Sequence, residues 1–382
     1  MSLTLLHTAD WQLGKQFAQV PGDPGAALRL RRLDTVKAIA ELARERRVDA
    51  VLVAGDVFED NAVSDETLRR TMHVLDPFKG PWVLLPGNHD AGLTQSAWSR
   101  LRRLAVVPAN VILADRPEPI VLCGGRLVVL PAPLRRRHEV GDLTEWYDTL
   151  RSDAGVLRVG LAHGAVTNRL PETAEAHNPI ADTRVETANL DYLALGDWHG
   201  TLEVANRTWY AGTPEPDRFK ANEPGNVLLV TLRESGAPPQ VERILVGYYR
   251  WIQLTFDVMD DQALAVLDGR LAALGESERT LVRLKLTGTV DLATKQQLDE
   301  RLDGWRARLH FLEVDDTALL ARTGLDDLAA LIAELGATGF VRDAIETLVG
   351  IEGDAGHPDQ ADAGRALQIL YREHKRLSKK GP

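Results

Sequence analysis

The chain opens with Leu3-Thr-Leu-Leu-His7-Thr-Ala-Asp10-Trp-Gln12, an apolar run that ends in polar side chains. Short leucine-rich or β-branched runs of this kind are typical of strands buried in a layered sheet. The same order recurs further along the chain, where apolar runs are followed by carboxylate, amide or imidazole side chains. We therefore expect this segment to be the first strand of an α/β fold.

Five more apolar runs extend this pattern, at residues 50–54, 82–85, 127–130, 157–162 and 192–195. Helical stretches, at about residues 26–47 and 64–78, separate the first three strands. Such strand-helix-strand alternation indicates a layered α/β domain. Three later runs, at 208–211, 226–232 and 240–246, follow one another with no room for helices. We expect these three to be antiparallel strands.

The pattern restarts after residue 251. Strands are expected at 252–257, 281–286 and 309–314, with helices at 261–274 and 292–302 between them. We expect a small α/β cap domain over residues 250–320. Apolar residues at helical spacing predict helices at 325–336, 339–349 and 360–377. The segment 324–382 is accordingly expected to be a C-terminal helical region that could bind a partner.

Composition narrows the class of protein. The chain has 382 residues, with 45 basic and 55 acidic side chains, and a formal charge of −10. This balance argues against coating nucleic acid by bulk charge. The single cysteine, Cys123, excludes an internal disulfide and a cysteine-rich zinc site. The N-terminus has no signal-peptide pattern and no run is long enough to span a membrane, so we expect a soluble cytoplasmic protein.

Polar side chains that bind metals follow five of the expected strands: Asp10 and Gln12, Asp56, Asn88 with His89 and Asp90, His163, and Asp197 with His199. Ligands of layered α/β folds bind beyond the carboxyl ends of the strands. Gathering several carboxylates there is costly without cations. Oxygen and imidazole donors suit Mn²⁺, Fe²⁺, Zn²⁺ or Mg²⁺, and paired ions about 3.5–4 Å apart are usual for phosphate-ester cleavage. Glycines before Asp56, Asn88 and Asp197 would allow a close approach of the backbone.

These ordered motifs resemble the calcineurin-like metallophosphoesterases. The opening segment His7 to Gly14 and the segment Trp209-Tyr-Ala-Gly-Thr-Pro-Glu215 are similar to the Mre11/SbcD-like branch of DNA repair exonucleases. The resemblance implies a layered β-sandwich flanked by helices over residues 1–246, which would be a nuclease domain. It also implies two divalent ions, most simply Mn²⁺ with Mg²⁺ or Fe²⁺ as alternatives, and an SbcC/Rad50-like ATPase as partner. Related proteins commonly form homodimers, and no contact with a membrane is expected.

The resemblance also assigns the ligands. One ion would be held by Asp10, Gln12, Asp56 and His199, and the other by Asp56, Asn88, His163 and Asp197. Asp56 would then bridge the ions, with a hydroxide between them as the nucleophile. His89 would protonate the leaving oxygen, and Asp90 would orient the imidazole of His89.

Two positions depart from the family pattern, which usually has histidine at positions 12 and 197. Gln12 weakens one ligand, and Asp197 adds a negative charge. The changes favour hard cations such as Mn²⁺ or Mg²⁺ over Zn²⁺. They leave the identity of the metal and the occupancy of the first site open.

Basic and aromatic side chains near the motifs offer further contacts. Arg135, Arg136 and Arg137 follow a strand directly, and we expect them to bind substrate phosphates. A second basic cluster, Arg29 to Arg32, is either a solvated helix face or another phosphate contact. Trp11 and Trp198 flank the ligands and either stack on a base or pack at the rim.

We expect a DNA exonuclease or endonuclease. One alternative keeps the ions but takes a small phosphodiester or a nucleotide as substrate. Another is a catalytically weak scaffold for the ATPase, suggested by the two changed ligands and the C-terminal helices.

Overall fold

The computed structural model describes residues 2–169, 177–322, 339–354 and 356–378. The chain divides into two compact units, residues 1–249 and 250–382. Each unit has its own hydrophobic core.

The first sheet of residues 1–249 has six strands in the order β14-β13-β1-β2-β3-β4. β1 to β4 are parallel, while β13 is antiparallel to both β1 and β14. The antiparallel direction expected for residues 226–232 and 240–246 is therefore confirmed. The bounds are β1 (Leu3–Thr8), β2 (Ala50–Val53), β3 (Trp82–Leu84), β4 (Val111–Leu113), β13 (Asn226–Leu232) and β14 (Gln240–Leu245).

The second sheet has the order β11-β12-β10-β7-β6-β5. Its bounds are β5 (Ile120–Leu122), β6 (Leu127–Ala132), β7 (Leu157–His163), β10 (Tyr192–Gly196), β11 (Leu202–Ala205) and β12 (Thr208–Tyr210). β12 is antiparallel to β11 but parallel to β10, so the antiparallel direction expected for residues 208–211 is wrong on one side. The reason is that β11 reverses the chain after β10, and β12 reverses it again and lies between them.

The two sheets pack face to face. Their shared core includes Leu5 and Leu52 from the first sheet and Val129 and Leu161 from the second, all fully buried. His7 adds a polar tie across this core, because Nδ1 lies 2.9 Å from the hydroxyl of Tyr192 and Nε2 lies 3.1 Å from the carbonyl oxygen of Leu195. Burial lowers the pKa of His7 to about 3, so its imidazole is neutral.

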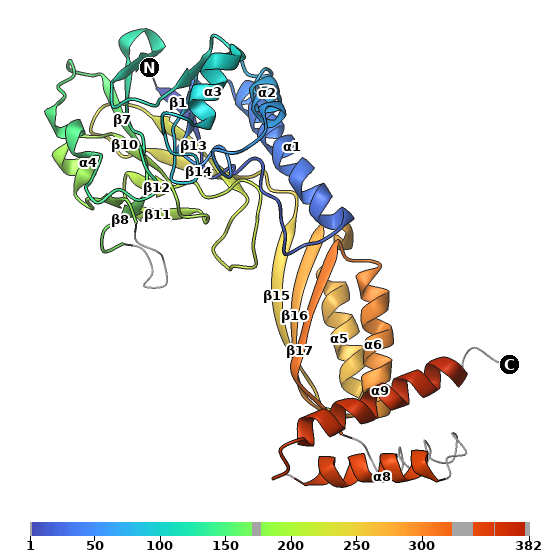
Figure 1. Cartoon of the computed structure of the whole chain (residues 1–382). Helices are drawn as coiled ribbons and strands as arrows, with labels where there is room; N and C mark the ends of the chain where they lie inside the picture. The colour runs from blue at the N-terminus through green and yellow to red at the C-terminus, as the bar shows by residue number, and fades with distance from the viewer. Residues whose placement is uncertain (1, 170–176, 323–338, 355, 379–382) are drawn as a thin grey trace. The chain divides into compact units, whose positions relative to one another are not determined.

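Helices cover the outer faces of the sandwich (Figure 1). On the first sheet these are α1 (Asp23–Glu45), α2 (Asp65–Val74) and α3 (Ala97–Leu104), which contribute to one apolar cluster with the strands. The second sheet carries α4 (Arg184–Thr187), the 3-10 turns η1 (Cys123–Gly125) and η2 (Glu145–Thr149), and the short pair β8 (Ala165–Val166) and β9 (Pro179–Ile180). The expected layered α/β fold, a β-sandwich flanked by helices, is confirmed.

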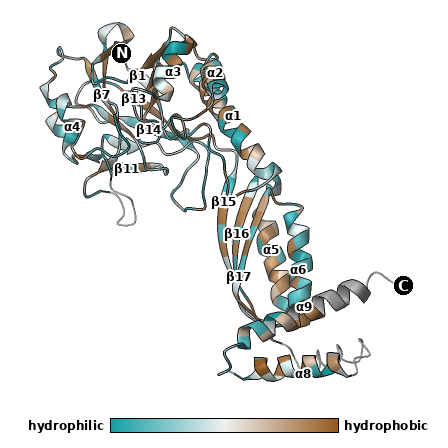
Figure 2. Ribbon diagram, viewed as in Figure 1, coloured by the Kyte–Doolittle hydropathy of each residue, from teal (hydrophilic) through white to brown (hydrophobic). Residues whose placement is uncertain are grey.

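Residues 250–382 begin with a three-stranded parallel sheet in the order β15-β16-β17. Its elements are β15 (Arg250–Val258), α5 (Asp261–Ala273), η3 (Ser277–Arg279), β16 (Thr280–Asp291), α6 (Leu292–Arg306) and β17 (Phe311–Arg322). Both long helices begin at an aspartate cap, Asp260 and Asp291. Figure 2 shows that α5 is more hydrophobic than α6, and residues of both contribute to the core over the sheet.

Two further helices follow, α8 (Phe340–Gly353) and α9 (Gln360–Ser378), and they pack on each other through Ile345 and Leu367. They correspond to the helices expected at 339–349 and 360–377, whereas the expected helix at 325–336 lies outside the described residues. None of the described helices combines the length and hydropathy needed to cross a membrane.

Candidate metal centre

The polar side chains singled out from the sequence lie at the carboxyl ends of parallel strands from both sheets. Asp10 and Gln12 follow β1, Asp56 follows β2, and Asn88 and His89 follow β3. His163 ends β7, and Asp197 and His199 follow β10. The loops are held together by the backbone, since the N–H of Asp10 donates to Gly55 (3.1 Å) and that of Gln12 to Asp56 (2.8 Å).

Unusual backbone conformations concentrate at these loops. Asp10, Gln12, Asp56 and Asp197 all have positive φ angles, of 52°, 42°, 52° and 98°. Such conformations cost on the order of 1–3 kcal/mol each and persist where the surrounding structure imposes them. The strain lies at candidate ligand positions, as is common at functional sites.

Glycines allow the loops to approach one another, as expected from the sequence. A Cβ atom at Gly87 would lie 2.1 Å from Oδ1 of Asp56, and one at Gly196 would lie 2.0 Å from the carbonyl oxygen of Ala54. No side chain fits at either distance. The loops after β2, β3 and β10 can therefore meet only with glycine at these positions.

His163 is the centre of one group of candidate ligands. Its Nε2 lies 2.9 Å from Oδ1 of Asn88, 3.5 Å from Oδ1 of Asp56 and 3.7 Å from Oδ1 of Asp197. Its Nδ1 lies 2.8 Å from the carbonyl oxygen of Ala54, to which it donates. A backbone acceptor on one ring nitrogen commonly orients the other toward a metal. We refer to Asn88, His163 and Asp197 as the His163 half.

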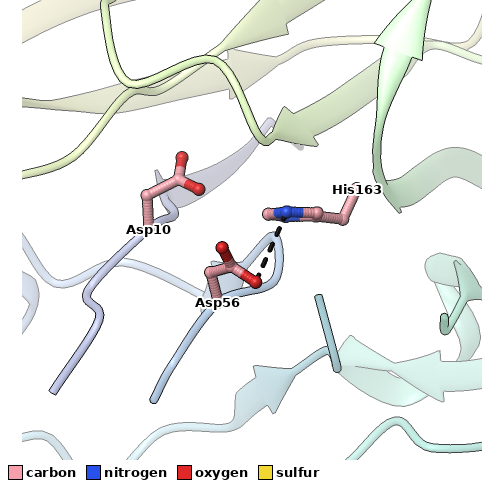
Figure 3. A group of neighbouring side chains, drawn as sticks. All are labelled: Asp10, Asp56 and His163. Atoms are coloured by element: carbon pink, nitrogen blue, oxygen red, sulfur yellow. Dashed lines mark ion pairs between the residues drawn. The ribbon is translucent and has the colours of Figure 1, made fainter. Parts of the chain in front are cut away.

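The charge in this group favours a cation. Burial alone would lower the pKa of His163, but Asp56, Asp10 and Asp197 raise it to about 9. Burial raises the pKa of Asp197 to about 6 and also raises that of Asp10. Among the His, Cys, Asp and Glu side chains that the structure describes, one group has ligand atoms all within 4.8 Å of one another, namely Asp10, Asp56 and His163 (Figure 3). These oxygen and imidazole donors fit divalent cations.

Gln12 and His199 form the second group, which we refer to as the His199 half. Nε2 of Gln12 lies 3.4 Å from Nε2 of His199. Lys15 donates to Oε1 of Gln12 over 3.2 Å. Arg218 donates through Nη2 to the ring of His199, over 2.9 Å to Nδ1. Two cationic side chains thus contact the candidate ligands of this half.

A buried carboxylate, Asp217, supports the His199 half. Its Oδ1 lies 3.3 Å from Nδ1 of His199, and its Oδ2 lies 3.3 Å from Nζ of Lys15. Burial opposes the ionised form, but His199 and Arg218 hold the pKa of Asp217 well below its usual range. Asp217, Lys15 and Arg218 were missed by sequence reasoning, since no local motif marks them.

His89 lies beside the candidate ligands. Its backbone N–H donates to Oδ1 of Asp56 (3.0 Å), and its Nδ1 lies 2.8 Å from the carbonyl oxygen of Glu59. The expected orientation of this imidazole by Asp90 is corrected here, because Asp90 instead accepts hydrogen bonds from the backbone of Gly87 and Phe58. Burial and the charge of Asp56 raise the pKa of Asp90 to about 8, against the effect of these two donors.

Arg32 corrects another expectation. It is 2 % exposed and donates to the carbonyl oxygens of Asp10, Trp11 and Glu215. It therefore braces the first ligand loop and neither faces solvent nor contacts substrate. Glu215 completes this support by accepting from Thr35 and from the backbone of residues 248 and 249.

Of the two tryptophans, Trp11 is excluded from base stacking. It is 1 % exposed and packs edge-on against Trp82 in the core. Trp198 is half-buried, and Nζ of Lys220 lies 4.5 Å from its ring centroid.

Arg135, Arg136 and Arg137 lie in an exposed loop after β6. The loop starts beside the β3 loop, where the N–H of Gly92 donates to the carbonyl oxygen of Leu134 (2.8 Å). Asn178 holds its far end by donating to the carbonyl oxygen of Arg137. The three side chains remain candidates for contacts with substrate.

Comparison with known proteins gives three findings. Residues 3–200 match the family model described as calcineurin-like phosphoesterase. The chain is 29 % identical over 266 residues to a component of the nuclease SbcCD from Bacillus subtilis, covering 60 % of this chain and 66 % of that protein. It is 25 % identical over 315 residues to the protein of the same name from Escherichia coli K12, covering 71 % and 72 %.

Among solved structures, the chain is similar to a dimetal phosphatase from Danio rerio. The identity is 13 % and the TM-score 0.38, with 63 % of this chain and 98 % of that one covered.

Proposed function

Because the chain belongs to the calcineurin-like phosphoesterase family, we propose that it is a metal-dependent phosphodiesterase that cleaves DNA. The observation that carries the proposal is the convergence of Asn88, Asp56 and Asp197 on Nε2 of His163 within 3.7 Å. The similarity to two bacterial proteins named as parts of a nuclease supports DNA as the substrate.

In this mechanism the chain holds two divalent cations, most simply Mn²⁺. Asp56 contributes to both positions, with Asp10, Gln12 and His199 at one and Asn88, His163 and Asp197 at the other. Bound ions of this kind supply an activated water nucleophile and offset negative charge on the reacting phosphate. The side chains of both halves fix the geometry of the site before substrate binds.

His89 protonates the leaving oxygen in this proposal. The carbonyl oxygen of Glu59 accepts from Nδ1–H, which leaves Nε2 to carry or release the proton. The N–H of His89 also donates to Asp56, so the imidazole and the shared carboxylate are held together. Asp90 keeps that loop in shape through its two backbone contacts.

The proposal is tested by incubating the purified protein with linear DNA and Mn²⁺, Mg²⁺, Fe²⁺ or Zn²⁺ in turn. We expect degradation with Mn²⁺. His89→Ala should lose activity by about 100- to 10,000-fold, the usual contribution of a general acid, while it retains its metal. His73→Ala is the matched control, since His73 is exposed on α2. DNA that stays intact with every ion would refute the proposal.

A small phosphodiester is distinguished by its turnover. If bis-p-nitrophenyl phosphate or a cyclic nucleotide is hydrolysed while DNA is not, the family chemistry holds and the substrate assignment fails. Arg135, Arg136 and Arg137 are proposed as peripheral contacts to DNA, so their joint replacement should affect DNA and spare the small substrate.

We further propose an SbcC/Rad50-like ATPase as partner, bound through α8 and α9. Phe340 and Ile369 on these helices are 85 % and 52 % exposed, which supports a role as a contact surface. Co-purification with such an ATPase should be lost in the double variant Phe340→Ser and Ile369→Ser. Sedimentation equilibrium of the isolated chain tests the proposed homodimer.

A further inference from the structure

The loop between β12 and β13 presents two cations beside the candidate metal centre. Its residues alternate in burial: Asp217 is 2 % exposed, Arg218 is exposed, Phe219 is 8 % exposed, and Lys220 is exposed. The two buried side chains anchor the loop. Arg218 and Lys220 consequently reach solvent at alternate positions of an anchored segment.

The guanidinium of Arg218 is held in place before any substrate arrives. Nε and Nη2 donate to the two carboxylate oxygens of Asp217 over 3.0 and 3.1 Å, and Nη2 also contacts His199. Within the described residues none of these hydrogen bonds uses Nη1, and 47 % of the side chain is exposed. A guanidinium fixed on one edge has its remaining donors ready for a phosphate, with little ordering cost on binding.

Lys220 reaches the same ligand turn from the other side of Phe219. Its Nζ lies 4.5 Å from the ring centroid of Trp198, the residue between Asp197 and His199. Both cations of the loop therefore contact the turn that carries two proposed metal ligands. In contrast to Arg135–Arg137, each has an identified partner that sets its position.

Cations beside a metal site repel the ions unless an anion lies among them. A phosphodiester supplies that anion. Two separate cations, one on His199 and one on Trp198, suit a substrate with successive phosphates better than a substrate with one.

Resting on the proposed function, we infer that Arg218 and Lys220 form a binding rim for a polynucleotide strand. Arg218 contacts the phosphate at the metal centre, and Lys220 contacts a neighbouring phosphate of the same strand. The specificity for DNA over a small phosphodiester comes in part from Lys220.

The test measures binding and turnover separately. Arg218→Gln and Lys220→Gln are compared with Arg44→Gln, a matched loss of charge at an exposed position of α1. Binding of a fluorescent single-stranded oligonucleotide is measured by anisotropy with Mn²⁺ in the His89→Ala background, over about 50–200 mM salt. We expect Kd to rise about tenfold for Arg218→Gln and about threefold for Lys220→Gln. Each variant should also lower the slope of log K against log salt by about one.

Turnover of bis-p-nitrophenyl phosphate distinguishes the two roles. Because this substrate has one phosphate, Arg218→Gln should raise its KM, and Lys220→Gln should leave both KM and kcat unchanged. On DNA both variants should raise KM more than they change kcat.

Salt slopes equal to that of Arg44→Gln would overturn the inference while leaving the proposed nuclease intact. Loss of bound Mn²⁺ from Arg218→Gln, with an unchanged salt slope, would also overturn it and make Arg218 a positioning residue for His199. If the unsubstituted protein cleaves bis-p-nitrophenyl phosphate but neither binds nor cleaves DNA, the proposed function itself fails.

Discussion

The His163 half and the His199 half of the centre differ in what surrounds their candidate ligand atoms. In the His163 half, three oxygens lie within 3.7 Å of one imidazole nitrogen, and the described contacts of that nitrogen are all with acceptors. In the His199 half, Lys15 and Arg218 already contact the amide and the ring. Because positive charge competes with a metal ion, we expect the His163 half to bind its ion more tightly.

The largest effect is expected where both halves depend on one side chain. Asp56→Asn removes the carboxylate that both ions would share and should lower activity by about 1,000-fold, as expected for losing several kcal/mol of transition-state stabilisation. Metal analysis should show loss of ions from the purified variant. Asp76→Asn, at an exposed position after α2, is the control and should behave like the unsubstituted protein. Full metal content in Asp56→Asn would contradict a shared ligand.

The comparison is broken directly by exchanging one imidazole at a time. His163→Gln should lower Mn²⁺ affinity about 100-fold, whereas His199→Gln should lower it about tenfold, because the second site already competes with two cations. Isothermal titration with Mn²⁺ measures both. Equal losses, or a larger loss for His199→Gln, would show that the two halves bind equally or in the reverse order.

A smaller change in the opposite direction is expected at Gln12. Gln12→His replaces a weak amide ligand by an imidazole and removes the acceptor of Lys15. We expect about tenfold tighter binding at the weaker site and a shift of preference toward Zn²⁺. Competition with a chelating dye measures both quantities. An unchanged affinity would place Gln12 outside the coordination sphere.

The smallest effect on catalysis is expected at His7, which lies between the sheets. Its pKa of about 3 is below the usual 6.5, so the unfolded chain binds a proton that the folded chain excludes. This contribution to stability is complete above pH 6.5 and is lost as pH falls toward 3, by about 1.4 kcal/mol per pH unit.

Urea unfolding at pH 7 and pH 5 should therefore show a smaller loss of stability in His7→Gln than in the unsubstituted protein. His73→Gln, at an exposed position, should keep the full loss. The same pH dependence in all three proteins would mean that His7 is not the group responsible.

Local sequence predicts the positions of the candidate ligands well because each motif is a short apolar strand followed directly by polar residues. Asp10, Asp56, Asn88 and His163 all lie at the strand ends where the pattern places them. The direction of β12 was wrong on one side because it depends on how β11 folds back, and the burial of Arg32 was missed because one of its partners, Glu215, lies far away in the sequence. Neither property leaves a local signal.

By itself, the sequence determined the α/β alternation, the residue types offered to a metal, and the glycines at Gly55, Gly87 and Gly196 that let the loops meet. The tertiary structure alone decided which of the candidate ligands are contacted by cations. Lys15 comes from a loop near the N-terminus, and Asp217 and Arg218 come from the loop after β12, yet all three meet around Gln12 and His199. Hydrophobic periodicity specifies each strand locally, whereas charge acts through space, so the balance between the two halves exists only once the sheets have packed.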